Sequence, residues 1–160
     1  HKIDCMGFKL IEKDKRKINI QFIKKLGIPD GPLLGKLQEG KSITWGGSLI
    51  TPEKATKKIK GKKIGIIPDT KLCNNCYKIA DGVDLLVCES TYAHNLIEKA
   101  KKHMHMTSKE AALVASESNV GQLILTHFSN RYKETHELEK EARTFFDKTS
   151  CANDLMKVDI

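Results

Sequence analysis

The stretch Ile124-Leu125-Thr126-His127-Phe128-Ser129-Asn130-Arg131-Tyr132 decides how the rest of the chain is interpreted. The apolar run from Gln122 to Thr126 predicts a strand that ends on His127. Such a strand places a ring nitrogen at the rim of a sheet, although a lone histidine is more often a satisfied core residue. Arg131 follows four residues later. Its planar guanidinium suits a phosphate; an ion pair with Glu134 is the alternative, and the two roles are not exclusive.

A second apolar run ends on an acid. Residues Lys63 to Ile67 predict a buried strand, and Pro68-Asp69-Thr70 follows it directly. An aspartate at a strand end is often only a helix N-cap. Its carboxylate can also bridge two zinc ions, for which histidine nitrogens are suitable ligands. Asp69 and His127 therefore predict a zinc site at strand ends, with the helix cap as the alternative for Asp69.

Strand and helix patterns alternate along the chain, which favours an α/β sandwich with sites at strand ends. The expected strands are 6–10, 42–45, 48–51, 63–67, 84–88, 122–126 and a final short strand 155–160. The expected helices are a short one after an Asn19 cap, 32–38, one after the capping box Thr107-Ser108-Lys109-Glu110, and 134–146.

Positive charge is concentrated in one segment. The 160 residues carry a net charge of +8, yet residues 9–63 hold 15 Lys/Arg against 5 Asp/Glu, and the remainder holds 13 against 15. A concentrated lysine field attracts polyanions such as nucleic acid. The alternative is a solvated, lysine-rich surface. Residues from about 13 to 60 are also the least core-like, so we expect them to form an excursion from the main body.

The cysteines and the hydropathy indicate a compartment. Five cysteines without a regular framework favour a reducing cytosol, and no apolar run approaches the roughly 20 residues of a membrane span. We therefore expect a cytoplasmic protein without a membrane partner. Cys73-Asn74-Asn75-Cys76 reads first as free thiols, with a second metal site or a disulfide as alternatives. His94 and His136 are expected on helix surfaces, and His103 at a helix end.

Several strings resemble, in the same order, the motifs of ribonuclease Z, a tRNA 3′-processing endonuclease family of the metallo-β-lactamase superfamily. The matching strings are His1-Lys2-Ile3-Asp4-Cys5-Met6-Gly7-Phe8, Gly27-Ile28-Pro29-Asp30-Gly31-Pro32, Pro68-Asp69-Thr70, Glu89-Ser90-Thr91-Tyr92, His105-Met106-Thr107 and the Leu125–Tyr132 string. Pro68 stands where the family has glycine, and Met106 where it has serine. The family's His-x-His-x-Asp-His string does not occur, so we expect the C-terminal part of a longer enzyme that is inactive in isolation.

The resemblance implies a fold and a division of the chain. The fold would be the C-terminal half of a metallo-β-lactamase αββα sandwich. Residues 1–12 would be a core strand, and 61–160 the C-terminal half of the core. Residues 13–60 would be a basic, tRNA-binding arm that includes Gly31 and Pro32.

The resemblance also implies the site and its partners. The metal ligands would be His1, Asp69 and His127, the catalytic pair Glu89 and His105, and the phosphate-binding residues Arg131 and His105. The cofactors would be two Zn²⁺ ions, the substrate precursor tRNA, and the assembly a homodimer. Two alternatives stay open: an RNA-binding or assembly module without activity of its own, and another metallo-β-lactamase-fold phosphodiesterase or small-ester hydrolase.

Overall fold

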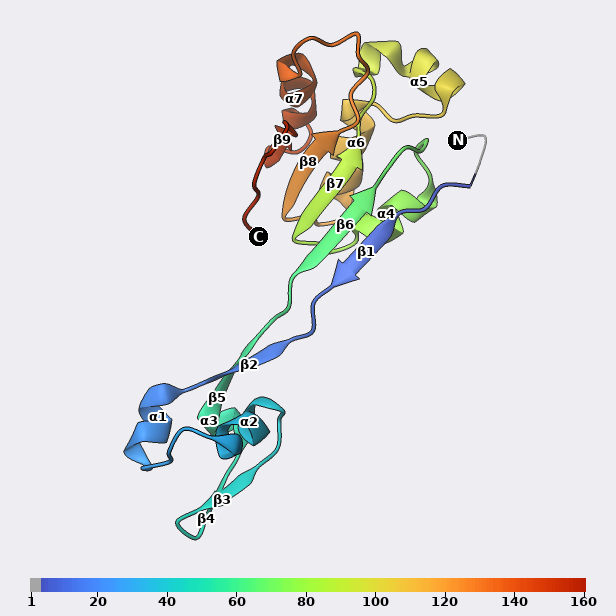
Figure 1. The fold of residues 1–160 in the computed structure, drawn as a ribbon. Helices are drawn as coiled ribbons and strands as arrows, with labels where there is room; N and C mark the ends of the chain where they lie inside the picture. Colours follow the sequence, from blue (N-terminus) through green and yellow to red (C-terminus); the bar gives the residue numbers. More distant parts are fainter. Residues whose placement is uncertain (1–3) are drawn as a thin grey trace. The chain divides into compact units, whose positions relative to one another are not determined.

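The computed structural model describes residues 4–160, which form two compact units (Figure 1). The larger unit consists of residues 4–11 and 62–160, and the smaller unit of residues 12–61. Each unit has its own cluster of buried apolar side chains. None of the helices in this part of the chain is long and apolar enough to cross a membrane.

The larger unit is built on a five-stranded sheet with the order β1-β6-β7-β8-β9. β6 to β9 run parallel, and β1 lies antiparallel beside β6. The strands are β1 (Phe8–Ile11), β6 (Lys63–Ile67), β7 (Leu85–Glu89), β8 (Gln122–Thr126) and β9 (Thr149–Cys151). The predicted α/β alternation is therefore present, and β6 to β9 follow one another in the sheet in the same order as in the sequence.

Helices cover one face of this sheet. Residues of that face are in register across the strands and belong to the buried core: Ile67, Cys88, Leu125 and Cys151. The core also contains residues of α4 (Asn74–Ala80), α6 (Ser108–Glu117) and α7 (His136–Arg143). Right-handed crossovers between neighbouring parallel strands place successive helices on the same side, which accounts for the single helical layer.

Residues on the opposite face of the sheet are also apolar and in register: Phe8, Ile66, Val87 and Ile124. Ile124 is buried, Ile66 and Val87 are half-buried, and Phe8 is 49% exposed. Because both faces of β6 to β8 carry apolar side chains, these strands are nearly continuous apolar runs in sequence and do not alternate between apolar and polar residues.

Two helical segments lie between β7 and α6, namely the 3-10 helix η1 (His94–Leu96) and α5 (Ile97–His103). α5 ends at His103 as predicted, and Met104 adopts the left-handed conformation that commonly ends helices. The predicted capping box is confirmed at Thr107: its side chain accepts from the Glu110 N–H, and the Glu110 carboxylate accepts from the Thr107 N–H. His94 is not a plain surface residue, since its ring Nδ1 lies 3.2 Å from Thr107 Oγ1.

The smaller unit combines two antiparallel strand pairs with three short helices around its own core. The pairs are β2 (Lys15–Ile18) with β5 (Thr56–Ile59), and β3 (Ile43–Trp45) with β4 (Ser48–Ile50). The helices are α1 (Ile20–Lys25), α2 (Pro32–Gln38) and α3 (Pro52–Ala55). The predicted Asn19 cap, the helix 32–38 and the Gly46-Gly47 hairpin are confirmed. The β2–β5 pair was missed because its lysines hide the strand pattern.

Two predictions for the end of the chain are wrong. Residues 155–160 form no strand, and Leu155 is 97% exposed at a φ of +64°. The last strand is β9, whose buried Thr149 and Cys151 alternate with half-buried Ser150. The predicted helix 134–146 is shorter, and α7 covers His136–Arg143. Three-residue strands such as β9 are too short to give a clear periodic pattern.

Candidate metal and catalytic site

The carboxyl ends of three neighbouring parallel strands gather the side chains of the site. Asp69 lies two residues after β6, Glu89 is the last residue of β7, and His127 directly follows β8. Ligands of open α/β sheets bind outside these strand ends. Because β6, β7 and β8 are adjacent and parallel, residues separated by up to 58 positions meet at one edge.

Glu89 is fully buried and accepts hydrogen bonds from four donors. Its Oε1 accepts from the Thr70 N–H at 2.9 Å and from His105 Nδ1 at 2.8 Å. Its Oε2 accepts from the Thr91 N–H at 3.0 Å and from the Thr91 hydroxyl at 2.8 Å. A carboxylate has about four acceptor positions, so this arrangement occupies them all. Glu89 therefore orients its neighbours and has no acceptor position left for a metal ion.

Thr91 connects this carboxylate to His127. The Thr91 hydroxyl has one proton, which it donates to Glu89. His127 Nδ1 lies 2.9 Å from the same hydroxyl oxygen, so Nδ1 must be the donor there. The network thus assigns the proton of a neutral His127 to Nδ1 and leaves Nε2 as the nitrogen with a lone pair. Metal-bound histidines are usually held in this way through their other nitrogen.

The Nε2 atom of His127 faces Asp69. The distance from Nε2 to Asp69 Oδ2 is 3.1 Å, and both side chains are about half exposed. In neutral His127 both facing atoms are acceptors, so a cation between them is needed, either a proton on Nε2 or a metal ion. Imidazole nitrogen and carboxylate oxygen are zinc donors, so the pair fits that ion. Pro68, where glycine was expected, does not move the Asp69 carboxylate away from the site.

The backbone of His127 has a conformation that supports this placement. Its φ is +57°, in the left-handed region that residues other than glycine seldom adopt. The Ser129 N–H donates to the Thr91 carbonyl at 3.1 Å, which ties the turn after β8 to the segment after β7. Unusual backbone conformations concentrate at functional sites, where the surrounding structure holds them.

His105 lies beside His127, with their ring centroids 5.2 Å apart. The side chain of His105 is 12% exposed, and its Nδ1 donates to Glu89, an assignment made from the hydrogen-bond network. Met106 beside it is completely buried, so the departure from the family's serine falls on a packing position. The arrangement orients Nε2 of His105 for proton exchange, because Nδ1 is held by the carboxylate.

Arg131 lies near the same site, with its guanidinium over the ring of Tyr92. Its guanidinium carbon lies 5.2 Å from the Tyr92 ring centroid, and the Tyr92 ring packs edge-on against His105 at 6.2 Å. Its Nε donates to the Ser129 hydroxyl at 3.1 Å. Within residues 4–160, no ion pair joins Arg131 to Glu134, so that alternative is wrong. The exposed guanidinium is positioned near the His105 side of the site.

The donor atoms of three residues lie within 4.8 Å of one another, namely Glu89, His105 and His127. This set differs from the predicted ligands His1, Asp69 and His127. His1 lies outside the described residues. The four hydrogen bonds on Glu89 argue against its use as a ligand, so Asp69 and His127 are the better donor pair in the described part of the chain.

The remaining predicted residues lie in the smaller unit. Gly31 has a φ of +155° and precedes α2 as its N-cap, and Pro32 occupies the first turn of that helix. Proline is favoured at that position because its missing N–H would have no partner there. Thr91 is a functional residue that the sequence does not mark, because a threonine two residues after an acid does not by itself predict a hydrogen-bond relay.

The chain resembles curated ribonucleases Z. That of Protochlamydia amoebophila (strain UWE25) is 42% identical over 156 residues, which are 98% of this chain and 51% of that protein. The chain spans about half the length of the curated relatives that it matches. No family model matches the chain.

Solved structures of metallo-β-lactamase-fold proteins resemble the fold of this chain. The metallo-β-lactamase fold protein YhfI from Bacillus subtilis has a TM-score of 0.51 and 26% identity over 56% of this chain and 36% of its own. The short form of human tRNase Z (ELAC1) has a TM-score of 0.50 and 30% identity, over 64% of this chain and 36% of its own. The predicted fold class and the predicted resemblance are therefore confirmed: the chain is similar to ribonucleases Z over nearly all of its length, and it has part of the fold of metallo-β-lactamase-fold proteins.

Proposed function

We propose that the protein is a zinc-dependent endoribonuclease that removes the 3′ trailer from tRNA precursors, and that the strand-end site supplies part of its catalytic centre. The facing pair of Asp69 Oδ2 and His127 Nε2, 3.1 Å apart, is the observation that carries the proposal. The similarity to proteins named ribonuclease Z and tRNase Z supports the proposed substrate.

Asp69 and His127 would hold metal on this chain, with His1 as a further candidate. Zinc in such a site supplies an acidified water and positive charge beside a scissile phosphate. The chain's own residues act by holding these side chains in place. Glu89 holds His105 directly and His127 through Thr91. One buried carboxylate therefore fixes the orientation of both imidazoles.

Arg131 and His105 would act on the substrate. The exposed guanidinium of Arg131 matches a phosphate with two parallel hydrogen bonds. His105 donates through Nδ1 to Glu89, so its Nε2 is the atom that would give a proton to the leaving oxygen. Glu89 steadies the charge that His105 carries before that transfer. The pair is thus a general acid and its orienting carboxylate.

The smaller unit is proposed as the tRNA-binding arm. Residues 12–61 carry twelve Lys/Arg against five Asp/Glu. On the β2–β5 pair, Lys17 lies directly opposite Lys57. Like charges in such cross-strand positions destabilise a sheet. A polyanion relieves the repulsion, and a folded RNA backbone supplies regularly spaced negative charge.

Zinc binding by the chain tests the site. We expect Zn²⁺ titration by calorimetry to show binding that is lost or strongly weakened in Asp69→Asn and His127→Gln. Asp147→Asn changes an exposed aspartate just before β9, at the edge of the sheet opposite the carboxyl ends of the strands; it is the matched control and should bind as the unaltered chain does. Equal zinc affinity in all four proteins would remove Asp69 and His127 from the metal site.

Substrate and assembly require separate measurements. The full-length protein should cleave a tRNA precursor at the 3′ trailer far more efficiently than a small phosphodiester. The reverse preference would favour another phosphodiesterase of the same fold, and tRNA binding without zinc binding would favour an RNA-binding module. Association into a homodimer is part of the same proposal, and sedimentation of the protein would check it.

A further inference from the structure

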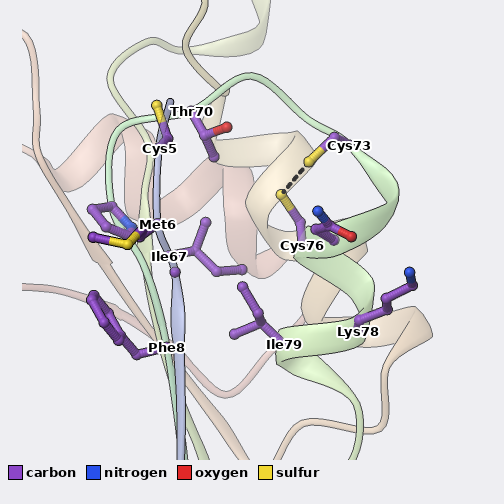
Figure 2. Close-up of a pocket in the computed structure, with 12 residues that line it drawn as sticks. Cys5, Met6, Phe8, Ile67, Thr70, Cys73, Cys76, Lys78 and Ile79 are labelled. Carbon is purple, nitrogen blue, oxygen red and sulfur yellow. Dashed lines mark hydrogen bonds between the residues drawn. The ribbon is translucent and has the colours of Figure 1, made fainter. Parts of the chain in front are cut away.

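A cavity of ≈ 380 Å³ in the larger unit is lined by three cysteines (Figure 2). Cys5 comes from the segment before β1, whereas Cys73 and Cys76 come from the start of α4 (Figure 2). The Sγ atoms of Cys73 and Cys76 are 3.7 Å apart. A disulfide requires an S–S distance of about 2.05 Å, so the two sulfur atoms must approach one another before they can be joined. Neither the metal site nor the proposed hydrolysis uses these thiols.

The two thiols of the pair differ in access. Cys73 is exposed at the cavity, and Cys76 is 2% exposed behind it. Burial raises the pKa of the Cys73 thiol. Hydrogen bonds from the backbone N–H groups of Asn75 and Cys76, together with the Cys76 side chain and the charge of Lys71, hold the pKa below its ordinary value. Burial raises the pKa of Cys76 to about 11. An accessible thiol with a buried partner is the arrangement in which the first attacks and the second resolves.

The lining of the cavity indicates the charge of its ligand. Lys78 lines it, and Lys71 is close enough to lower the pKa of Cys73 by its positive charge. The twelve described lining residues include no Asp or Glu. Apolar side chains from Met6, Phe8 and Ile79 complete the wall (Figure 2). A positive, partly apolar cavity beside a reactive thiol fits a small anionic molecule.

We propose that Cys73 and Cys76 form a thiol–disulfide exchange site for a small anionic disulfide. The Cys73 thiolate attacks one sulfur of the ligand, which forms a mixed disulfide and releases one thiol. Cys76 then loses its proton and attacks Cys73 Sγ, which releases the second thiol. Two protein thiols are oxidised to one disulfide, the ligand is reduced to two thiols, and the two protons leave with them. The new bond closes a loop of residues 73–76, which follows the segment that carries Asp69 and Thr70.

The test uses the reduced 160-residue chain and three disulfides: oxidised glutathione, which is anionic, hydroxyethyl disulfide, which is neutral, and cystamine, which is cationic. Mass spectrometry with peptide mapping follows the products. We expect the chain to lose two hydrogens and to contain a Cys73–Cys76 bond, fastest with oxidised glutathione. Cys76→Ser, with Cys76→Ala beside it because the position is buried, should accumulate a mixed disulfide at Cys73. Cys73→Ser should lose both products.

Lys78→Gln should remove the preference for the anionic disulfide, whereas Lys99→Gln, on α5 outside the cavity, should keep it. Equal rates with all three disulfides in the unaltered chain would overturn the assigned ligand class. Consumption of oxidised glutathione at an unchanged rate by Cys73→Ser, or a first adduct at Cys5, would overturn the site itself. None of these outcomes depends on zinc or on RNA cleavage.

Discussion

At the scale of single residues, one buried carboxylate organises the site. All four acceptor positions of Glu89 are occupied by donors from Thr70, Thr91 and His105. Glu89 is connected to His127 through the Thr91 hydroxyl. Such networks are costly to break because each member left unpaired keeps its desolvation penalty. Thr91 is therefore a positioning residue: it acts through His127 and touches neither metal nor substrate in the proposed mechanism.

Thr91→Val keeps the shape of the side chain and removes the relay. We expect zinc affinity and cleavage by the full-length protein to fall by about 10–100-fold, the usual effect of losing a hydrogen bond that orients a metal ligand. Thr91→Ser should restore most of both, since the hydroxyl returns. Zinc titration and single-turnover cleavage would measure the effects. A valine variant with normal zinc affinity would show that His127 does not depend on the relay.

His105→Ala separates proton transfer from metal binding. We expect the rate of the chemical step in the full-length protein to fall about 10²–10⁴-fold, as is typical for loss of a general acid. Zinc content and tRNA affinity should change little. The His136→Ala variant, altered at an exposed residue of α7, serves as the control. Loss of zinc in His105→Ala would instead make His105 a ligand, as the short distances among Glu89, His105 and His127 allow.

At the scale of elements, α6 begins beside the site, and its first turn is tied to it. Thr107 caps the helix, contacts His94 and forms an isolated bridge to Tyr92, which packs against His105. The Ser108 hydroxyl donates to Glu141 on α7, which also accepts from the His94 N–H. The position of the segment carrying His105 thus depends on how α6 starts.

Thr107→Ala should destabilise the chain by about 0.5–2 kcal/mol, the usual cost of losing an N-cap hydrogen bond. Urea unfolding followed by circular dichroism would measure this. Thr135→Ala is the matched control, because Thr135 begins α7 without a side-chain capping bond and should cost less. Equal costs for both variants would mean that the capping box adds nothing to stability.

At the scale of the whole molecule, two separate apolar cores divide the chain. The larger unit has its core around β6 to β8, and the smaller unit has its own around Ile23, Leu37 and Ile43. Within the larger unit, Ile11 pairs directly with Lys63. The two chain ends left by removing residues 12–61 would therefore be neighbours across antiparallel strands, a distance that a tight turn can close.

Replacing residues 12–61 with a short Gly/Asn turn should leave the larger unit folded and its zinc affinity unchanged. Affinity for tRNA should fall severely, and the dependence of binding on salt should flatten, because phosphate contacts are lost with their counterion release. Filter binding at several salt concentrations and zinc titration would measure both. An unchanged salt slope would contradict an RNA-binding role for the unit, and loss of zinc binding would show that the unit supports the core.

Local signals in the sequence were sufficient for much of the fold. The runs 63–67 and 122–126, the cap at Asn19, the capping box at Thr107 and the Gly46-Gly47 turn each depend on neighbouring residues, so periodicity and turn chemistry found them. The concentration of lysine in one segment was visible for the same reason. The short strand Thr149–Cys151 was missed, since its place is decided by pairing with β8.

The site required the tertiary structure. Family resemblance supplied Asp69, Glu89, His105 and His127 as candidates, but only parallel pairing of β6, β7 and β8 brings their strand ends together. Likewise, Cys5 is 68 positions from Cys73 in sequence and lines the same cavity. The relay through Thr91 depends on the left-handed backbone of His127. Local sequence patterns predict which helices and strands form. How close residues far apart in sequence lie in space is decided by how those elements pair and pack.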